Sequence, residues 1–156
     1  MGKYLILKDT REKEKKGWIF KTDRSCAGTE VQKLDTGDYT IAGFENILCI
    51  ERKGSVSEFA RNIVEKRFEK ELDRMDEFPY SYILLEFTEE DINNFPKGCG
   101  IPRRVQKYVR IKPKFIYYRI KEIMEQHKVK IILCGDNGKQ IAQEIFDFVL
   151  NDVKSR

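Results

Sequence analysis

The segments Leu34-Asp35-Thr36-Gly37-Asp38-Tyr39 and Ile47-Leu48-Cys49-Ile50-Glu51-Arg52-Lys53 decide the expected fold of this chain. In the first, a Gly-Asp turn leads into an apolar strand, and in the second an apolar strand ends in a charged triplet. Side chains alternate along a strand, so Glu51 and Lys53 are expected on one face. The two segments therefore predict a strand pair that brings Asp38 close to Glu51 and Lys53.

This charge pattern is typical of a divalent-metal site. Two neighbouring carboxylates, Asp38 and Glu51, repel each other and resist ionisation unless a cation lies between them. Mg²⁺ or Mn²⁺ prefers such hard oxygen ligands and lowers the pKa of a bound water. The ammonium of Lys53 can hold an attacking water or a developing negative charge. The alternative is a solvated charged triplet with an unrelated turn aspartate.

Further motifs lie on both sides of this core. Asp9-Thr10-Arg11-Glu12 follows an apolar run near the start, and Arg67-Phe68-Glu69-Lys70-Glu71-Leu72 follows the triplet. In this order the motifs resemble the nuclease domain of the XPF-type structure-selective endonucleases, a branch of the PD-(D/E)xK restriction-endonuclease-like group. That family reads D-x-R-E, then G-D, then E-R-K followed after three residues by D. The resemblance extends over most of the chain.

The resemblance implies an architecture and an activity. The expected fold is α/β, with a restriction-endonuclease-like central mixed sheet flanked by helices on both sides. It is expected to form a single domain over residues 1–156 without a helix-hairpin-helix module. The implied activity is metal-dependent hydrolysis of phosphodiesters in branched, flapped or otherwise irregular DNA, as in DNA repair or recombination. The alternative is a DNA-binding subunit or module with a nuclease fold that does not cleave.

The family motifs also imply residue roles at the strand pair. Asp38 and Glu51 are implied to bind Mg²⁺ or Mn²⁺ directly, and Lys53 to position or activate the water. Arg52 is implied to contact a phosphate or to have a structural role.

Two further acids are implied to lie around this centre. Asp9 and Glu12 would act through water or by binding a second ion, and Arg11 is expected to pair with one of these carboxylates. The expected catalytic residues are thus Asp9, Glu12, Asp38, Glu51, Arg52 and Lys53, of which Asp9, Asp38 and Glu51 bind metal.

One position departs from the family pattern. The last acid of the pattern falls at residue 57, which here is Ser57. Glu58 could replace it, but residues 55–58 have the spacing of a helix capping box, which we favour. On that interpretation the site has one carboxylate fewer than the family pattern, and a weaker or slower site is expected.

Composition favours a single reduced intracellular domain. The 156 residues are 40% hydrophobic and 36% charged, with a net charge of +4. Cys26, Cys49, Cys99 and Cys134 show no metal-binding spacing, so zinc is not expected. Cys49 and Cys134 fall in apolar runs and are expected in the core. We expect a cytoplasmic location, with nucleoid association or a viral origin left open, and no signal peptide or membrane-spanning segment.

Strand and helix patterns alternate along the chain, which favours an α/β sandwich. Strands are predicted at residues 4–8, 31–41, 46–52, 80–87 and 131–134, with a loop at 25–29. Apolar residues at helical spacing predict one helix from Ser57 to about Met75 and another from Lys139 to Val153. His127 is expected at the end of a helix, with no catalytic role.

Residues 97–114 contain seven basic residues and no acidic residue. Aromatic residues follow at Phe115, Tyr117 and Tyr118, and this combination suits a nucleic-acid surface. The alternative is a solvated helix whose rings pack inward. Whether two copies of the chain form a homodimer is left open. The residues predicted to bind DNA are Arg67, Arg103, Arg104, Lys107 and Arg110.

Overall fold

A computed structural model of the chain describes residues 2–14 and 17–156. It contains a six-stranded mixed sheet in the order β2-β1-β3-β4-β5-β6. β1 pairs with β2, β4 with β5, and β5 with β6 in parallel, whereas β3 is antiparallel to both β1 and β4. The strands are β1 (Tyr4–Lys8), β2 (Cys26–Val31), β3 (Tyr39–Ile41), β4 (Leu48–Lys53), β5 (Tyr80–Leu85) and β6 (Lys130–Leu133).

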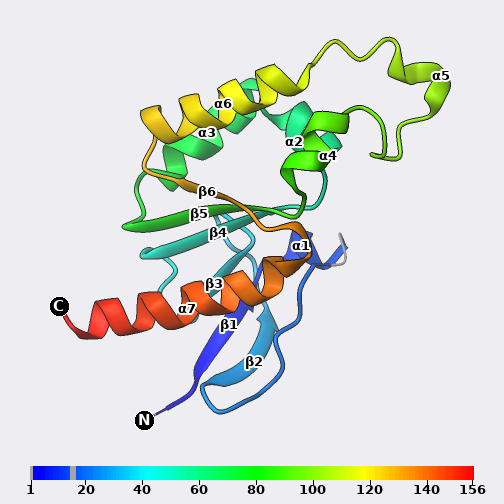
Figure 1. Ribbon diagram of the computed structural model, residues 1–156. Helices are drawn as coiled ribbons and strands as arrows, with labels where there is room; N and C mark the ends of the chain where they lie inside the picture. Colours follow the sequence, from blue (N-terminus) through cyan, green and yellow to red (C-terminus); the bar gives the residue numbers. More distant parts are fainter. Residues whose placement is uncertain (1, 15–16) are drawn as a thin grey trace.

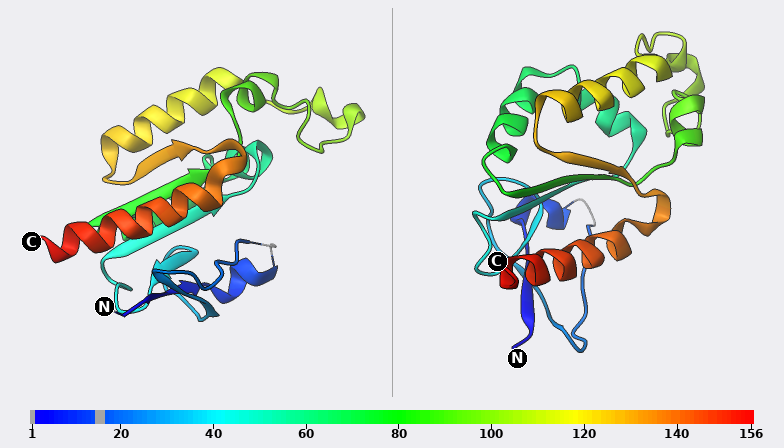
Figure 2. Two further views of the ribbon diagram at one scale, coloured as in Figure 1. Left: turned by 60° about the horizontal axis from the view of Figure 1, so that its bottom comes forward. Right: turned by 60° about the vertical axis from the view of Figure 1, so that its left-hand side comes forward.

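Helices cover both faces of the sheet, as predicted. Figure 1 shows α2, α3, α4 and α6 on one side and α7 on the other, and the turned views of Figure 2 keep this separation. Among the described helices, none combines the length and apolarity needed to cross a bilayer. The helices are α1 (Thr10–Glu14), α2 (Val56–Asn62), α3 (Lys66–Met75), α4 (Glu89–Asn94), α5 (Arg103–Gln106), α6 (Pro113–Gln126) and α7 (Gly138–Lys154), with a short 3₁₀ turn at Gly135–Asn137.

The alternation along β4 divides its side chains between two cores. Leu48 and Ile50 pack in the core beneath α7, whereas Cys49 packs in the core formed with α2, α3, α4 and α6. The same alternation continues into the charged triplet, as expected. Lys53 Nζ lies 5.4 Å from the ring centre of Phe68 in the second core. Arg52 therefore points to the opposite face from Lys53.

The predicted strand at 31–41 and loop at 25–29 are wrong. β2 begins at Cys26 and ends at Val31, and the next strand begins only at Tyr39. The Asp23 side chain accepts hydrogen bonds from Ser25 N at 2.9 Å and Cys26 N at 2.7 Å, which forms the turn into β2. The strand then pairs in parallel with β1. This pairing depends on a distant segment, so local sequence does not reveal it.

The predicted single helix from Ser57 to Met75 is two helices. α2 ends at Asn62 and α3 begins at Lys66, after an extended residue, Glu65. The Asn62 side chain donates to Glu65 Oε1 at 3.1 Å across this joint. Apolar spacing continues through the break because both helices bury one face in the same core. The strands at 80–87 and 131–134 and the last helix are confirmed, with ends that differ by at most about two residues.

Smaller expectations are confirmed as well. Cys49 and Cys134 are buried and free. Ser55 caps α2, because its Oγ accepts a hydrogen bond from Glu58 N at 3.1 Å. This supports the capping interpretation of residues 55–58.

His127 follows the last residue of α6 and ties this helix to α3. Its Nδ1 lies 2.7 Å from Asp76 Oδ2, and its Nε2 lies 3.0 Å from Glu69 Oε1. Burial alone would lower the pKa of His127, but the hydrogen bonds to Asp76 and Glu69 outweigh burial and raise it. The hydrogen bond from His127 in turn lowers the pKa of Glu69. The geometry is that of an imidazolium clamped between two carboxylates.

This clamp predicts a pH-dependent stability. Because the pKa of His127 is raised in the folded state, the protonated side chain contributes its full stabilisation below the unfolded pKa of 6.5. That stabilisation is lost as the pH rises through the folded-state pKa. Urea denaturation of wild type and His127→Gln at about pH 5.5 and about pH 9 should show a difference in unfolding free energy of about 1 kcal/mol at the lower pH only, since the carboxylates are partly exposed. An equal difference at both pH values would contradict the clamp.

Candidate active site

The turn before β3 approaches β4 so closely that only glycine fits at residue 37. Gly37 has a φ of +82°, and a Cβ there would lie 2.5 Å from Cys49 Sγ and 3.2 Å from the Ile50 carbonyl oxygen. The next residue, Asp38, donates its backbone N–H to the same Ile50 oxygen at 2.8 Å. The Gly-Asp pair is therefore pressed against β4 beside the residues that precede Glu51.

Hydrogen bonds then orient Asp38. Its Oδ2 accepts from the backbone N–H of Arg52 at 2.8 Å, and its carbonyl oxygen accepts from Asp9 N at 2.8 Å. The side chain thus satisfies a β4 donor beyond the end of the β3–β4 ladder. These bonds hold the ends of β1, β3 and β4 together at Asp38.

A polar cavity of about 260 Å³ opens at this point. Asp38, Glu51 and Lys53 all line it, and they are only 8%, 7% and 6% exposed. Arg67, the fourth predicted residue in the lining, lies at the exposed rim. The remaining lining residues are Arg11, Asp35, Thr36, Gly37, Asn62, Glu71 and Arg74.

The cavity has the character of a cation site. Burial raises the pKa of the Cys49 thiol, and the charges of Asp38 and Glu71 raise it further, so a negative field reaches into β4. Carboxylate oxygens are the hard ligands that Mg²⁺ and Mn²⁺ prefer. The donor set of Asp38 and Glu51, beside the ammonium of Lys53, therefore fits a divalent cation.

A second acidic group lies elsewhere. Asp73, Asp76 and His127 have ligand atoms within 4.8 Å of one another, and in the described part of the chain no other trio of potential metal ligands is so close. The carboxylates of the cavity would therefore have to rotate toward an ion to bind it together. The His127 group is already explained by its ion pairs.

Asp9 lies beside the cavity and is not among the residues that line it. It is fully buried, and its Oδ1 accepts from Leu34 N at 2.8 Å. Its Oδ2 accepts from Arg11 Nε at 2.7 Å, the pairing expected for Arg11. Burial would raise the pKa of Asp9, but the hydrogen bonds from Leu34 and Arg11 lower it. Asp9 thus positions Arg11, which does line the cavity.

Arg52 and Glu12 lie on the other face of β4. Arg52 Nε is ion-paired with Glu86, and its Nη1 lies 3.6 Å from Glu12 Oε1. The guanidinium lies 5.7 Å from the ring centre of Trp18, whose Nε1 donates to Glu86 Oε2 at 3.2 Å. Of the two roles implied for Arg52, this placement favours the structural one. Arg52 links β4 to α1, to the segment around Trp18 and to the residue after β5.

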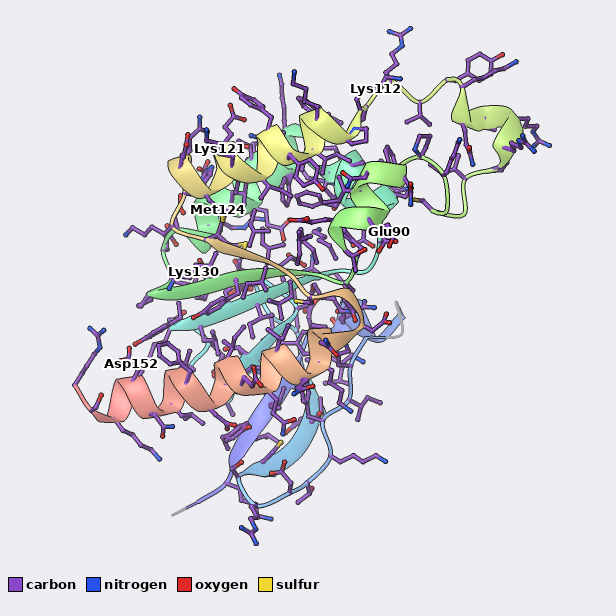
Figure 3. The ribbon with its side chains drawn as sticks, viewed as in Figure 1. Glu90, Lys112, Lys121, Met124, Lys130 and Asp152 are labelled. Atoms are coloured by element: carbon purple, nitrogen blue, oxygen red, sulfur yellow. The ribbon has the colours of Figure 1, made fainter. Side chains whose placement is uncertain are left out.

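The basic residues between α4 and α6 form a separate surface, which we call the basic extension (residues 97–114). Figure 1 shows this segment, with α5, projecting away from the sheet, and Lys112, labelled in Figure 3, is exposed near its end. Tyr108 is 71% exposed, and Lys107 Nζ lies 5.2 Å from its ring centre. The predicted DNA-binding residues Arg103, Arg104, Lys107 and Arg110 are all exposed here and do not line the cavity.

The aromatic residues after the basic extension divide between surface and core. Phe115 and Tyr118 are 38% and 58% exposed, whereas Ile116 is fully buried. Tyr117 is half-buried and donates to Asn93 Oδ1 at 3.0 Å. The alternative that these aromatic rings pack inward therefore holds in part for Tyr117 and does not hold for Phe115 and Tyr118.

Two charged residues of α3 that line the cavity, Glu71 and Arg74, were given no site role from the sequence. With Arg67 they recur at positions i, i+4 and i+7 on the polar face of α3, which indicates a shared surface. Arg74 also lines an adjoining cavity of about 610 Å³, and the two cavities share Asp35 and Thr36. The helical spacing could have grouped these residues, but it could not show that they face β4.

Comparison with known proteins identifies the family. The chain belongs to the ERCC4 domain family, whose sequence model matches residues 8–142. The fold is similar to that of XPF from Aeropyrum pernix in complex with DNA, with a TM-score of 0.62, 16% identity and coverage of 96% of this chain and 66% of that chain. Another structure of XPF from Aeropyrum pernix is similar with a TM-score of 0.61 and 19% identity, and the match covers 97% of this chain and 69% of that chain.

These matches confirm the resemblance to the XPF nuclease domain and the mixed-sheet fold. This chain spans about two thirds of the length of the XPF chains it matches. No curated protein matches it by sequence.

The fit of Gly37 predicts a stability difference between two glycines. Gly43 also has a positive φ, +93°, but a Cβ there would meet nothing within 4 Å. Gly43→Ala should cost about 1 kcal/mol from backbone strain alone. Gly37→Ala adds a clash with Cys49 and should cost about 1–3 kcal/mol more. Urea denaturation measures both, and equal losses would show that the close approach to β4 is not a constraint.

Proposed function

We propose that this chain is a divalent-metal-dependent DNA endonuclease acting on branched, flapped or otherwise irregular DNA. One observation carries the proposal: Asp38, Glu51 and Lys53 are buried charges that open into one polar cavity. Family membership supports it, because the same motifs define the resemblance to structure-selective endonucleases. The preference for irregular DNA rests on that resemblance alone.

The proposed reaction is hydrolysis of a phosphodiester. The oxygen of water attacks phosphorus, one P–O ester bond breaks, and the leaving oxygen takes a proton. Asp38 and Glu51 would hold Mg²⁺ or Mn²⁺, which when bound polarises the phosphate and acidifies water. Lys53 places a positive charge where the attacking water or the developing phosphate charge lies. Burial of Lys53 strengthens this interaction, because water screens it less.

DNA contact is proposed at two surfaces, the rim of the cavity at Arg67 and the basic extension. The matched XPF structure was solved in complex with DNA. The seven basic residues of the extension stand without a neighbouring acid in sequence, so they can bind phosphates. Exposed Tyr108 can stack on an unpaired base.

A second candidate is a DNA-binding module that does not cleave. Ser57 favours it, because the family pattern has an acid at that position. The endonuclease and the binding module would bind DNA through the same surfaces, and only the endonuclease would cleave it.

Cleavage itself is the first test. Purified protein with Mg²⁺ or Mn²⁺ is incubated with flap, fork, junction, duplex and single-stranded DNA, beside Asp38→Asn and Glu51→Gln. Both variants keep the side-chain shape, and the amide oxygen introduced by Asp38→Asn can still accept from Arg52 N, so the fold should persist. Nicking should fall at least about 100-fold, because each variant removes one negative ligand. Undiminished cutting by both would make the site assignment wrong, and no cutting by wild type would favour the binding module.

The basic extension is tested by the salt dependence of DNA binding. Changing Arg103, Arg104 and Lys107 to glutamine should reduce the slope of log K against log [salt] by about 3, since each phosphate contact contributes about 0.9. A matched control changes three exposed lysines of α6, β6 and the residues between them, Lys121, Lys128 and Lys130, of which Figure 3 labels the first and last. Equal slope changes in both triple variants would place the DNA surface elsewhere.

A further inference from the structure

The cavity contains a carboxylate that the family pattern does not provide. The pattern's last acid is replaced by Ser57, and the neighbouring Glu58 lies in the first turn of α2 with its N–H bonded to Ser55 Oγ at 3.1 Å. Neither Ser57 nor Glu58 is among the residues that line the cavity. Glu71, from α3, is among them.

The orientation of α3 directs Glu71 into the cavity. Phe68 and Leu72 are buried in the core beneath the helix, which fixes the face that α3 turns toward the sheet. Arg67, Glu71 and Arg74 form the adjacent row along the helix, and all three line the cavity. The position of Glu71 therefore follows from core packing.

Glu71 shares the cavity with the two proposed metal ligands. Asp38 and Glu51 line it from the turn before β3 and from β4, and Glu71 lines it from α3.

We propose that Glu71 is the third carboxylate of the metal-binding set and replaces the acid that the family pattern has at residue 57. This inference rests on the proposed function of the same cavity. The ligands then come from three elements: the turn before β3 with Asp38, the end of β4 with Glu51, and α3 with Glu71. The long side chain of glutamate suits a ligand that reaches across from the helix wall.

The test is titration of the full chain with MnCl₂ by isothermal calorimetry. All proteins carry Asp73→Asn, which removes one ligand of the separate Asp73–Asp76–His127 group. In this background Glu71→Gln and Asp38→Asn should each weaken Mn²⁺ binding by at least about tenfold. The matched control, Glu58→Gln, removes the other candidate acid and should change the affinity by less than about twofold. Circular dichroism melts without metal show whether each variant is folded.

A second measurement separates metal binding from general damage. The Mn²⁺ concentration that gives half-maximal nicking should rise at least about tenfold in Glu71→Gln, with much of the rate recovered at high Mn²⁺. Unchanged Mn²⁺ affinity in folded Glu71→Gln, together with weakened affinity in Asp38→Asn, would overturn the role of Glu71 and leave the proposed function standing. Unchanged affinity in both variants would overturn both.

Discussion

The site depends on one constraint, the pairing of the Gly37-Asp38 turn with β4. Asp38 donates its backbone N–H to Ile50 and accepts the N–H of Arg52 through its carboxylate. The side chain therefore replaces a strand partner where the ladder ends, and without it a β4 donor would be buried unpaired, which is costly. Because this acceptor is a carboxylate, the same bond that completes the sheet places a negative charge beside Glu51.

β4 separates two kinds of buried charge. On the face of α7, Arg52 is paired with Glu86 and Glu12 and lies against Trp18, so its charge is compensated by the protein. On the other face, Glu51 and Lys53 open to a cavity that solvent or a ligand can enter. Alternation of one triplet thus supplies both an ion-pair network on one face of β4 and an open polar cavity on the other. The first links β4 to Glu12 and Glu86, and the second is lined by the residues of the candidate site.

Patterns confined to one element were predictable, and arrangements between elements were not. Alternation placed Glu51 and Lys53 on the same face because strand geometry is local. By contrast, the first residues of β2 were predicted to form a loop, because the strand's pairing partner, β1, lies about 20 residues earlier in the chain. The break after Asn62 was hidden because both helices bury their apolar faces in one core. Glu71 was missed for the same reason, since its place in the cavity depends on the direction of α3.

The orientation of α3 also limits where residues can be inserted into the chain. A helix turns about 100° per residue, and Phe68 and Leu72 fix which side of α3 faces the sheet. One residue inserted between Phe68 and Glu71 would swing the carboxylate about a quarter of a turn from its cavity. Insertions within α5 itself would directly disturb neither core, since none of its residues is buried. In related sequences, insertions and deletions are thus expected to be common in α5 and rare in the second turn of α3.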